Sequence, residues 1–176
     1  FDVRTNTLLA EIPLSPPGNS TLDWNTLVIN ATGSRAYAVS WANNGKVAAV
    51  DLHQRSLLYY TSGIYQPHGI VLTPDESHVL ITCQRGNVVY DMDTSLQNYR
   101  EITLETNPAL QLDPHDIRFH PDGKQVWISC QQSNEVRVYD WPAWTKKAQL
   151  QVGVFPQELT YSKLLNCFFV SCTLDP

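Results

Sequence analysis

The chain has no long apolar segment, no excess of basic residues and no dense set of cysteines. No hydrophobic run approaches the roughly 20 residues needed to cross a bilayer, so the sequence predicts no membrane-spanning segment. Lys and Arg number 12 against 17 Asp and Glu, giving a net charge of -5, which argues against nucleic acid bound through phosphate neutralisation. The four cysteines include no C-x-x-C pair, so they predict neither a disulfide framework nor a zinc or redox motif.

Short catalytic motifs are also absent. The sequence has no Gly-x-Ser-x-Gly elbow, no phosphate-cradling glycine loop and no His-Glu-x-x-His pair. With 43% hydrophobic and 16% charged residues, the chain nevertheless has enough apolar side chains to fold around a core. We therefore expect a globular protein and favour a binding function over an enzymatic one.

One unit is present four times. Four segments align position for position without gaps, and their starts lie 43, 47 and 42 residues apart. Each has an apolar run, a turn and a second apolar run, which is the pattern of a β-hairpin. In two copies the turn is Pro-Asp-Glu or Pro-Asp-Gly. The aligned segments are 24–40, 67–83, 114–130 and 156–172.

Further strands follow the first three hairpins. The third strands, GKVAAVDL, GNVVYDMD and NEVRVYDW, end near an Asp, and weaker fourth strands come next. Four short antiparallel strands recurring at this spacing are typical of a β-propeller blade. The predicted fold class is therefore all-β, a β-propeller of four-stranded antiparallel blades, of which this chain covers about four.

We interpret residues 1–176 as a single propeller segment. Because each blade packs only on its neighbours, a closed ring needs more blades than these. We expect a seven-bladed ring whose remaining blades belong to the same chain, with completion by a partner chain as the alternative. The end of one blade is assigned to 1–14, near-complete blades to 22–61, 65–105 and 112–152, and the start of the next blade to 156–176.

The motifs Pro-His-Gly-Ile at 67–70, Pro-Asp-Glu or Pro-Asp-Gly in the turns, and NEVRVYD in a third strand resemble the YVTN-type repeat of seven-bladed bacterial and archaeal propellers. The resemblance covers the whole chain, although the copy from Trp24 lacks the Pro-His and the third strand in CQRGNVVYD is shortened. It implies a periplasmic or cell-surface protein. The family and its relatives include adhesive surface proteins, binding proteins and propeller domains of redox enzymes, so the resemblance alone does not define a function.

The first strand of each hairpin begins, and the second ends, at the same rim of the propeller. Counting back from the turn at 74–77 places His68 opposite Cys83. The sequence therefore predicts a ring of polar pairs around one mouth of the central channel. The other predicted pairs are His115 with Cys130, Asn25 with Ser40, and Gln157 with Cys172.

The repeated His and Cys have two interpretations. Imidazole and thiolate are ligands of zinc and copper, and the metal-ligand candidates are His68, Cys83, His115 and Cys130. We favour a packing role, in which the thiol fills space and the imidazole bonds to a nearby loop. No cofactor is predicted, and a zinc, copper or calcium ion is the alternative.

The Asp residues near the third-strand ends are predicted to accept backbone N–H groups in turns. They are Asp2, Asp51, Asp91 and Asp140. Trp141 and Trp144 are predicted to pack at an outer-strand corner, with a partner contact as the alternative.

The connections between blades differ from one another. They read SPPGNSTLD, SGIYQ, ETNPALQLD and GVF, and loops that vary on a regular frame are where specificity is usually placed. Aromatic, amide, carboxylate and imidazole groups gather at this rim, which suits a small polar ligand or a peptide end. The candidate binding residues are Asn25, Tyr65, His68, Asn107, Asp113, His115, Asp116, Phe155, Gln157 and Glu158, with Gln111 beside them.

The leading hypothesis is a non-enzymatic binding scaffold of the cell envelope that recognises a protein or a small polar ligand at this rim. The alternative is a metal- or cofactor-binding enzyme or redox subunit, of the lactonase or oxidoreductase type, that uses the channel mouth. Nucleic acid is disfavoured as a partner by the acidic charge balance.

Overall fold

The computed structural model describes residues 1–14 and 24–174, and its regular elements there are all β-strands. Three four-stranded sheets follow one another along the chain, and a hairpin follows them. Blade 1 consists of β1 (Trp24–Ile29), β2 (Arg35–Ser40), β3 (Gly45–Asp51) and β4 (Ser56–Ile64). Blade 2 consists of β5 (Pro67–Leu72), β6 (His78–Cys83), β7 (Val88–Asp93) and β8 (Tyr99–Thr103). Blade 3 consists of β9 (Pro114–Phe119), β10 (Gln125–Cys130), β11 (Glu135–Asp140) and β12 (Thr145–Gln151). The terminal hairpin is a separate sheet and consists of β13 (Pro156–Ser162) and β14 (Cys167–Cys172).

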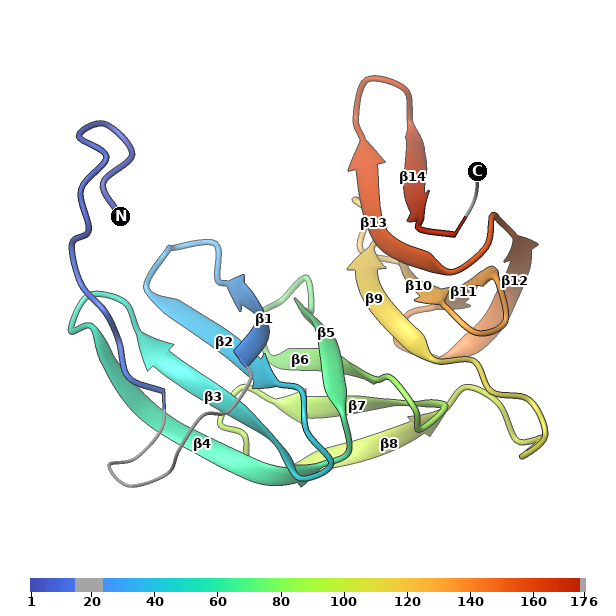
Figure 1. The fold of residues 1–176 in the computed structure, drawn as a ribbon, viewed down its shortest axis with the longest axis horizontal. Helices are drawn as coiled ribbons and strands as arrows, with labels where there is room; N and C mark the ends of the chain where they lie inside the picture. Colours follow the sequence, from blue (N-terminus) through green and yellow to red (C-terminus); the bar gives the residue numbers. More distant parts are fainter. Residues whose placement is uncertain (15–23, 175–176) are drawn as a thin grey trace.

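The sheets are arranged as the blades of an open ring. Within each sheet the strands pair antiparallel in sequence order. Figure 1 shows the blades along an arc, with the first strand of each toward the inside and the fourth toward the outside. Each inner strand contacts the inner strand of the next sheet. The all-β propeller predicted from the repeat is therefore confirmed, while the number of blades in a complete ring stays a prediction.

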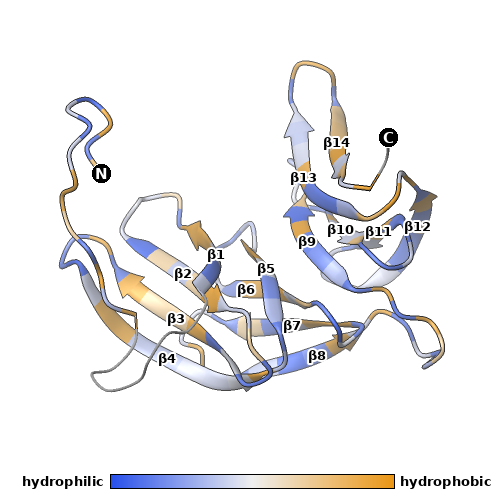
Figure 2. Ribbon diagram, in the orientation of Figure 1, coloured by the Kyte–Doolittle hydropathy of each residue, from blue (hydrophilic) through white to orange (hydrophobic). Residues whose placement is uncertain are grey.

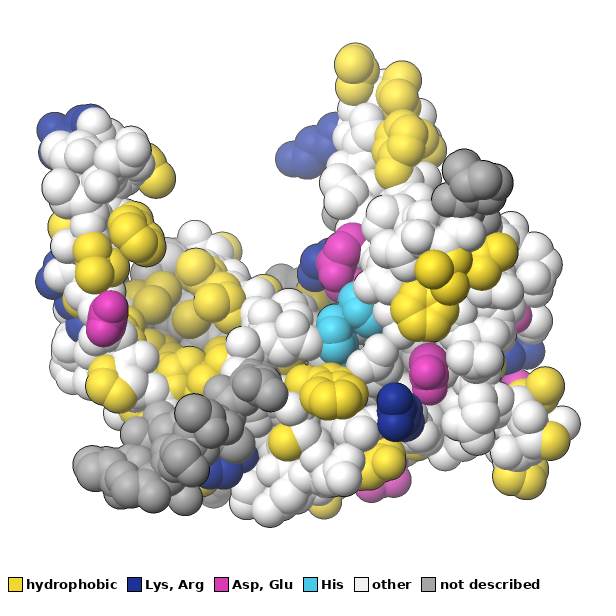
Figure 3. All heavy atoms as spheres, viewed as in Figure 1, with side chains coloured by type: hydrophobic (Ala, Val, Ile, Leu, Met, Phe, Trp, Pro, Cys, Tyr) yellow, Lys and Arg dark blue, Asp and Glu magenta, His cyan; other side chains and the backbone are white. Residues whose placement is uncertain are grey.

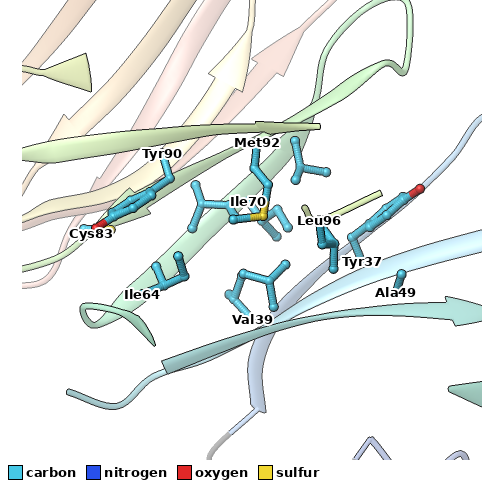
Figure 4. Packing of buried hydrophobic residues seen from close by; sticks show 12 residues of the cluster. Tyr37, Val39, Ala49, Ile64, Ile70, Cys83, Tyr90, Met92 and Leu96 are labelled. Carbon is cyan, nitrogen blue, oxygen red and sulfur yellow. The ribbon is translucent and has the colours of Figure 1, made fainter. Parts of the chain in front are cut away.

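Two hydrophobic clusters hold the blades face to face. Figure 2 shows hydrophobic and hydrophilic residues interspersed along the strands, and the second and third strands of each blade are buried along most of their length. Between blades 1 and 2, Val39 packs with Ile70 and Met92 (Figure 4). Between blades 2 and 3, Leu80 and Ile128 lie in the second cluster. Each blade is thus stabilised mainly by burial against its neighbours.

Residues 1–14 form no strand in the structure. They contain an isolated bridge between Asp2 and Thr7, and the Asp2 carboxylate accepts the backbone N–H of Arg4 at 2.9 Å, as predicted for a turn. Figure 1 shows this segment as an arm that extends away from the sheets. The connection SPPGNSTLD at 15–23 and the predicted blade start at residue 22 lie outside the described residues.

No helix that is long and apolar enough to span a membrane occurs in the described ranges.

The predicted register at the channel mouth is wrong by one residue. Pro67, not His68, lies opposite Cys83, and Pro114, not His115, lies opposite Cys130. A β-bulge near the start of each first strand supplies the extra residue. The same shift replaces the other two predicted pairs with Trp24 opposite Ser40 and Pro156 opposite Cys172.

A hydroxyl on the second strand stabilises the bulge in three of the hairpins. Thr82 Oγ1 accepts the N–H of Gly69 at 2.8 Å, and Ser129 Oγ accepts the N–H of Asp116 at 3.0 Å. In the terminal hairpin, Ser171 Oγ accepts the N–H of Glu158 at 3.2 Å. The bulge is therefore part of the repeat.

The same hydroxyls also connect neighbouring blades. Thr82 Oγ1 donates to the carbonyl of His115 at 2.7 Å, and Ser129 Oγ donates to the carbonyl of Gln157 at 2.5 Å. Each hydroxyl thus accepts from its own blade and donates to the next one. The bulge fixes where successive inner strands meet.

The predicted turn role holds for Asp51, whose carboxylate accepts the N–H of Gln54 at 2.7 Å, but is wrong for Asp91. Asp93 is the residue in register with Asp51 at the end of the third strand, and it accepts the N–H of Gln97 at 3.1 Å. The sequence YDMD contains two Asp, and the strand continues to the second.

Asp91 is buried and forms ion pairs with His78 at 2.6 Å and with Arg100 at 2.7 Å. Asp140 lies at a strand end, but the turn bond comes from its backbone carbonyl, which accepts the N–H of Trp144 at 2.8 Å, while its carboxylate pairs with Lys147 at 3.4 Å instead of taking the predicted role. Trp141 and Trp144 are partly buried against the second hydrophobic cluster, so their predicted packing role is confirmed.

Candidate functional site

Two imidazoles meet at the inside of the arc. His68 and His115 follow the first residues of β5 and β9, and their ring centroids lie 3.7 Å apart at an interplanar angle of 39°. Figure 3 shows histidine side chains gathered at the concave inner edge of the molecule, beside acidic and basic ones. Sequence reasoning missed this contact because pairing within a blade does not give distances between blades.

Burial keeps these imidazoles uncharged. It lowers the pKa of His68, and, together with the neighbouring His68, it lowers the pKa of His115 to about 3. Nδ1 of His115 is buried without a hydrogen-bond partner and lies 3.8 Å from a carboxylate oxygen of Glu158. Near neutral pH the mouth therefore offers neutral imidazole nitrogens instead of positive charge.

Asp116, next to His115, takes part in the joint to the terminal hairpin. Its carboxylate accepts the N–H of Leu159 at 2.8 Å and pairs with Arg118 at 3.2 Å. Burial raises the pKa of this carboxyl, against the lowering effect of the Arg118 charge. Asp116 was predicted as a ligand contact, and the structure engages both of its oxygens in contacts within the protein.

The lowered pKa of His115 predicts a loss of stability in mild acid. Between its ordinary pKa of 6.5 and about 3, the unfolded state binds a proton that the folded state does not. The free energy of unfolding therefore falls with decreasing pH through this interval, by roughly 1.4 kcal/mol per pH unit for one such group. Asp116 acts in the opposite sense between pH 3.8 and its raised pKa of about 6, because in this interval the folded state binds a proton that the unfolded state does not, so the effect of His115 is isolated by comparing wild type with a His115 variant.

We expect His115→Gln, which repeats the residue found at the equivalent position 157, to reduce this acid sensitivity. Urea unfolding at about pH 7 and about pH 5 would measure it, since a single buried group accounts for a difference of this size. An unchanged pH dependence in the variant would contradict the assignment.

A chain of hydrogen bonds runs along the same rim. The indole N–H of Trp41 donates to Gln84 at 2.6 Å, and the Gln84 amide donates to Gln131 at 2.6 Å. Each of these residues follows directly after the second strand of its blade. Sequence reasoning missed them, although they recur at the same spacing as the aligned segments.

A cavity of 280 Å³ opens at the mouth beside this chain. We call it the mouth pocket, and it contains two of the predicted binding residues, Asn25 and His68. Its described lining is Trp24, Asn25, Trp41, His68 and Gln84.

A second hollow lies farther out, over the junction of blades 2 and 3. It consists of cavities of 510 Å³ and 350 Å³ that share Gln111 and Gln132, and we call the two together the junction groove. The connection between blades 2 and 3 forms one wall of it. The larger part is lined by Ala109, Leu110, Gln111, Leu112, Gln132, Ser133, Glu135, Arg137 and Gln149, and the smaller by Arg85, Gln111, Asp113 and Gln132.

The remaining predicted residues line neither hollow. Asn107 accepts the N–H of Ala109 at 3.0 Å and shapes its own loop, and Tyr65 is exposed. The backbone N–H of Phe155 donates to Asn134 at 2.9 Å. Gln157 supplies the carbonyl that Ser129 bonds, and Glu158 is exposed beside Arg118 at 3.5 Å.

The four metal-ligand candidates do not form one group. Cys83 lies in the hydrophobic cluster between blades 1 and 2, and Cys130 lies in the one between blades 2 and 3. Burial raises the pKa of both thiols, that of Cys130 to about 12, which disfavours the thiolate that binds metals. Among residues 1–14 and 24–174, no three His, Cys, Asp or Glu side chains gather in a way that could hold a metal ion.

The fold and its polar rim define a segment of a β-propeller. No family model and no curated protein matches the chain. Among solved structures, the hydrazine synthase of Kuenenia stuttgartiensis is similar at a TM-score of 0.68 and 13% identity, over 84% of this chain and 58% of that one. A functionally unknown protein from Desulfotomaculum acetoxidans gives 0.67 and 16% identity, over 88% and 50%.

The periplasmic gluconolactonase of Pseudomonas aeruginosa gives a TM-score of 0.64 and 12% identity, over 81% of this chain and 48% of that one. At these identities the likeness shows the fold. The chain spans about half the length of these three proteins, at 58%, 50% and 48%.

Proposed function

We propose that the protein is a non-enzymatic binding propeller that holds a small polar ligand or a peptide end on the rim carrying the connections between blades. The observation that supports this proposal is the position of the two hollows. The mouth pocket and the junction groove both lie where first strands begin and second strands end. Variable connections, cavities and hydrogen-bonding side chains thus coincide on one rim.

The chemistry of the mouth favours a ligand that is bound through hydrogen bonds. Two indoles offer flat apolar surface, and two amides and a neutral imidazole offer donors and acceptors. A metal-dependent enzyme is the alternative left by the sequence, and no described group of side chains favours it.

A binding screen with variants on both rims tests the proposal. Small polar molecules and short peptides would be screened by thermal shift on the complete protein, and each hit measured by calorimetry. We expect His68→Ala or Trp41→Ala to weaken such a hit by about tenfold or more, as for loss of a hydrogen bond or an aromatic contact in a pocket. Lys124→Ala, on the exposed turn of the opposite rim, is the matched control and should bind normally.

Equal affinity in all three variants would contradict binding in the mouth pocket, and equal affinity also in Gln132→Ala/Ser133→Ala, in the junction groove, would contradict binding at this rim. Turnover of the bound molecule would contradict the non-enzymatic part of the proposal.

We also propose that further blades of the same ring cover the open faces of this segment. Exposed apolar side chains support this, because Leu27 on β1 is 59% exposed and Phe169 on β14 is 55% exposed. Hydrogen exchange of β14 in the complete protein would test it, since covered strands exchange slowly.

Placement in the periplasm or on the cell surface is part of the same proposal. The YVTN-like repeat supports it, as does a structural neighbour that is itself periplasmic. Cell fractionation would test it.

A further inference from the structure

A buried ion pair forms the floor of the junction groove. Glu135 and Arg137 are each 2% exposed, and Arg137 Nε donates to a Glu135 carboxylate oxygen at 2.6 Å. The equivalent positions in blade 2 are Val88 and Tyr90. The pair is therefore particular to this junction and is not part of the repeated blade frame. Buried ion pairs seldom add stability over apolar residues of the same size, so the stability of the blade does not account for this pair.

The surrounding contacts hold both charged groups in place. Arg137 also donates to the carbonyl of Leu104 at 2.6 Å and to Glu105 at 3.0 Å. The second Glu135 oxygen accepts the amide of Gln149 at 2.6 Å. The floor of the groove is thus rigid before any ligand arrives, which reduces the entropy lost on binding.

The walls offer hydrogen-bonding groups to a ligand, although the Gln111 amide also donates to the carbonyl of Pro108 at 3.4 Å. Gln111 and Gln132 are exposed at the groove, and each amide carries both donors and an acceptor. Ser133 Oγ is buried and has no hydrogen-bond partner, and Ser133 lines the same cavity. Buried hydroxyls are normally satisfied, and because Ser133 Oγ is itself covered, a ligand supplies the missing bond only when the Ser133 side chain rotates toward the cavity.

The charged residues that line the groove balance. Arg137 lies against Glu135 on the floor, and Arg85 and Asp113 line the inner part together. Glu105, 3.0 Å from Arg137, adds one further negative charge, so an anion gains no net attraction from this site. Ala109, Leu110 and Leu112 add an apolar strip along one wall. The lining therefore fits a neutral molecule that has both hydroxyl groups and C–H surface.

We propose that the junction groove binds a neutral polyhydroxylated ligand, such as one or two residues of an uncharged glycan. Each hydroxyl both donates and accepts, which matches amide side chains and a fixed carboxylate. The 510 Å³ of the larger cavity is of ordinary size for a small-molecule site. This inference rests on the proposed function for the choice of rim, but it concerns residues other than those of the mouth pocket.

Ligand-observed NMR and calorimetry on the complete protein test it. The probes are glucose, galactose, mannose, N-acetylglucosamine and cellobiose, with glucuronate and short peptides for comparison. We expect at least one neutral sugar to bind in preference to glucuronate. The double variant Gln132→Ala/Ser133→Ala removes wall groups without touching the ion pair, and should weaken that binding by about tenfold or more, the effect of two lost hydrogen bonds.

Lys124→Ala, on the exposed turn of the opposite rim, is the control and should leave sugar binding unchanged, whereas His68→Ala reports whether a probe binds in the mouth pocket. Absence of binding by every neutral sugar, preference for glucuronate, or full binding by the double variant would each overturn the inference. Binding of peptides alone, weakened by His68→Ala, would overturn the sugar site and leave the proposed function standing. Sugar binding at the groove followed by chemical conversion of the sugar would support the sugar site and overturn the proposed non-enzymatic function.

Discussion

Replacing Arg137 with alanine is expected to lower the free energy of unfolding by about 3–5 kcal/mol, because it leaves a buried carboxylate without its partner. The Glu135 side chain is 3% exposed and keeps only the Gln149 and Gln151 amides after the change. The carbonyl of Leu104 also loses its guanidinium donor. Urea unfolding at neutral pH would measure the loss.

The double variant Glu135→Leu/Arg137→Met distinguishes an unpaired charge from a general loss of packing. It removes both charged groups and keeps similar volumes, so most of the lost stability should return. A single Arg137→Ala variant within about 1 kcal/mol of wild type would show that water reaches the pair, as it does in exposed ion pairs.

Gly69→Ala is the second change expected to have a large effect. A Cβ at this position would lie 2.5 Å from the carbonyl oxygen of His115 and 2.9 Å from Thr82 Oγ1. Both atoms belong to the joint between blades 2 and 3, so neither can move without separating the inner strands. We expect a loss of about 2–3 kcal/mol, as for overpacking of a tight core position, measured by thermal or urea unfolding.

Gly33→Ala is the matched control for the conformational freedom of glycine. Gly33 has a positive φ of 69°, but a Cβ there meets nothing within 4 Å, so only backbone strain of about 1 kcal/mol is expected. Equal losses at Gly33 and Gly69 would show that the close approach at the joint is not the cause.

The fold could be predicted from the sequence because the period of the repeat is a strong signal. The aligned hairpin segments coincide with strand pairs in the structure, from β1–β2 to β13–β14. The register at the mouth could not be predicted by counting, because a bulge adds one residue that alternation does not reveal. The error placed His68 opposite Cys83, whereas the bulge leaves His68 beside His115.

The candidate site was predicted only in part for a related reason. Asn25, His68, Gln111 and Asp113 were selected from their positions at strand starts and in a variable connection, and they line hollows. Glu135 and Arg137 were not selected, because within a third strand they occupy positions that are apolar or aromatic in blade 2. The charged residues at these third-strand positions were the signal in the sequence that could have pointed to the junction groove.

The hydrogen bonds from the Thr82 and Ser129 hydroxyls to the next blade do not depend on which side chains line the mouth. Thr82 and Ser129 bond the main-chain carbonyls of His115 and Gln157, not their side chains. A duplicated blade can therefore exchange imidazole for amide at this position and still dock onto its neighbour. Over evolutionary time the mouth can acquire a new set of side chains one blade at a time, while the frame that supports them is inherited unchanged.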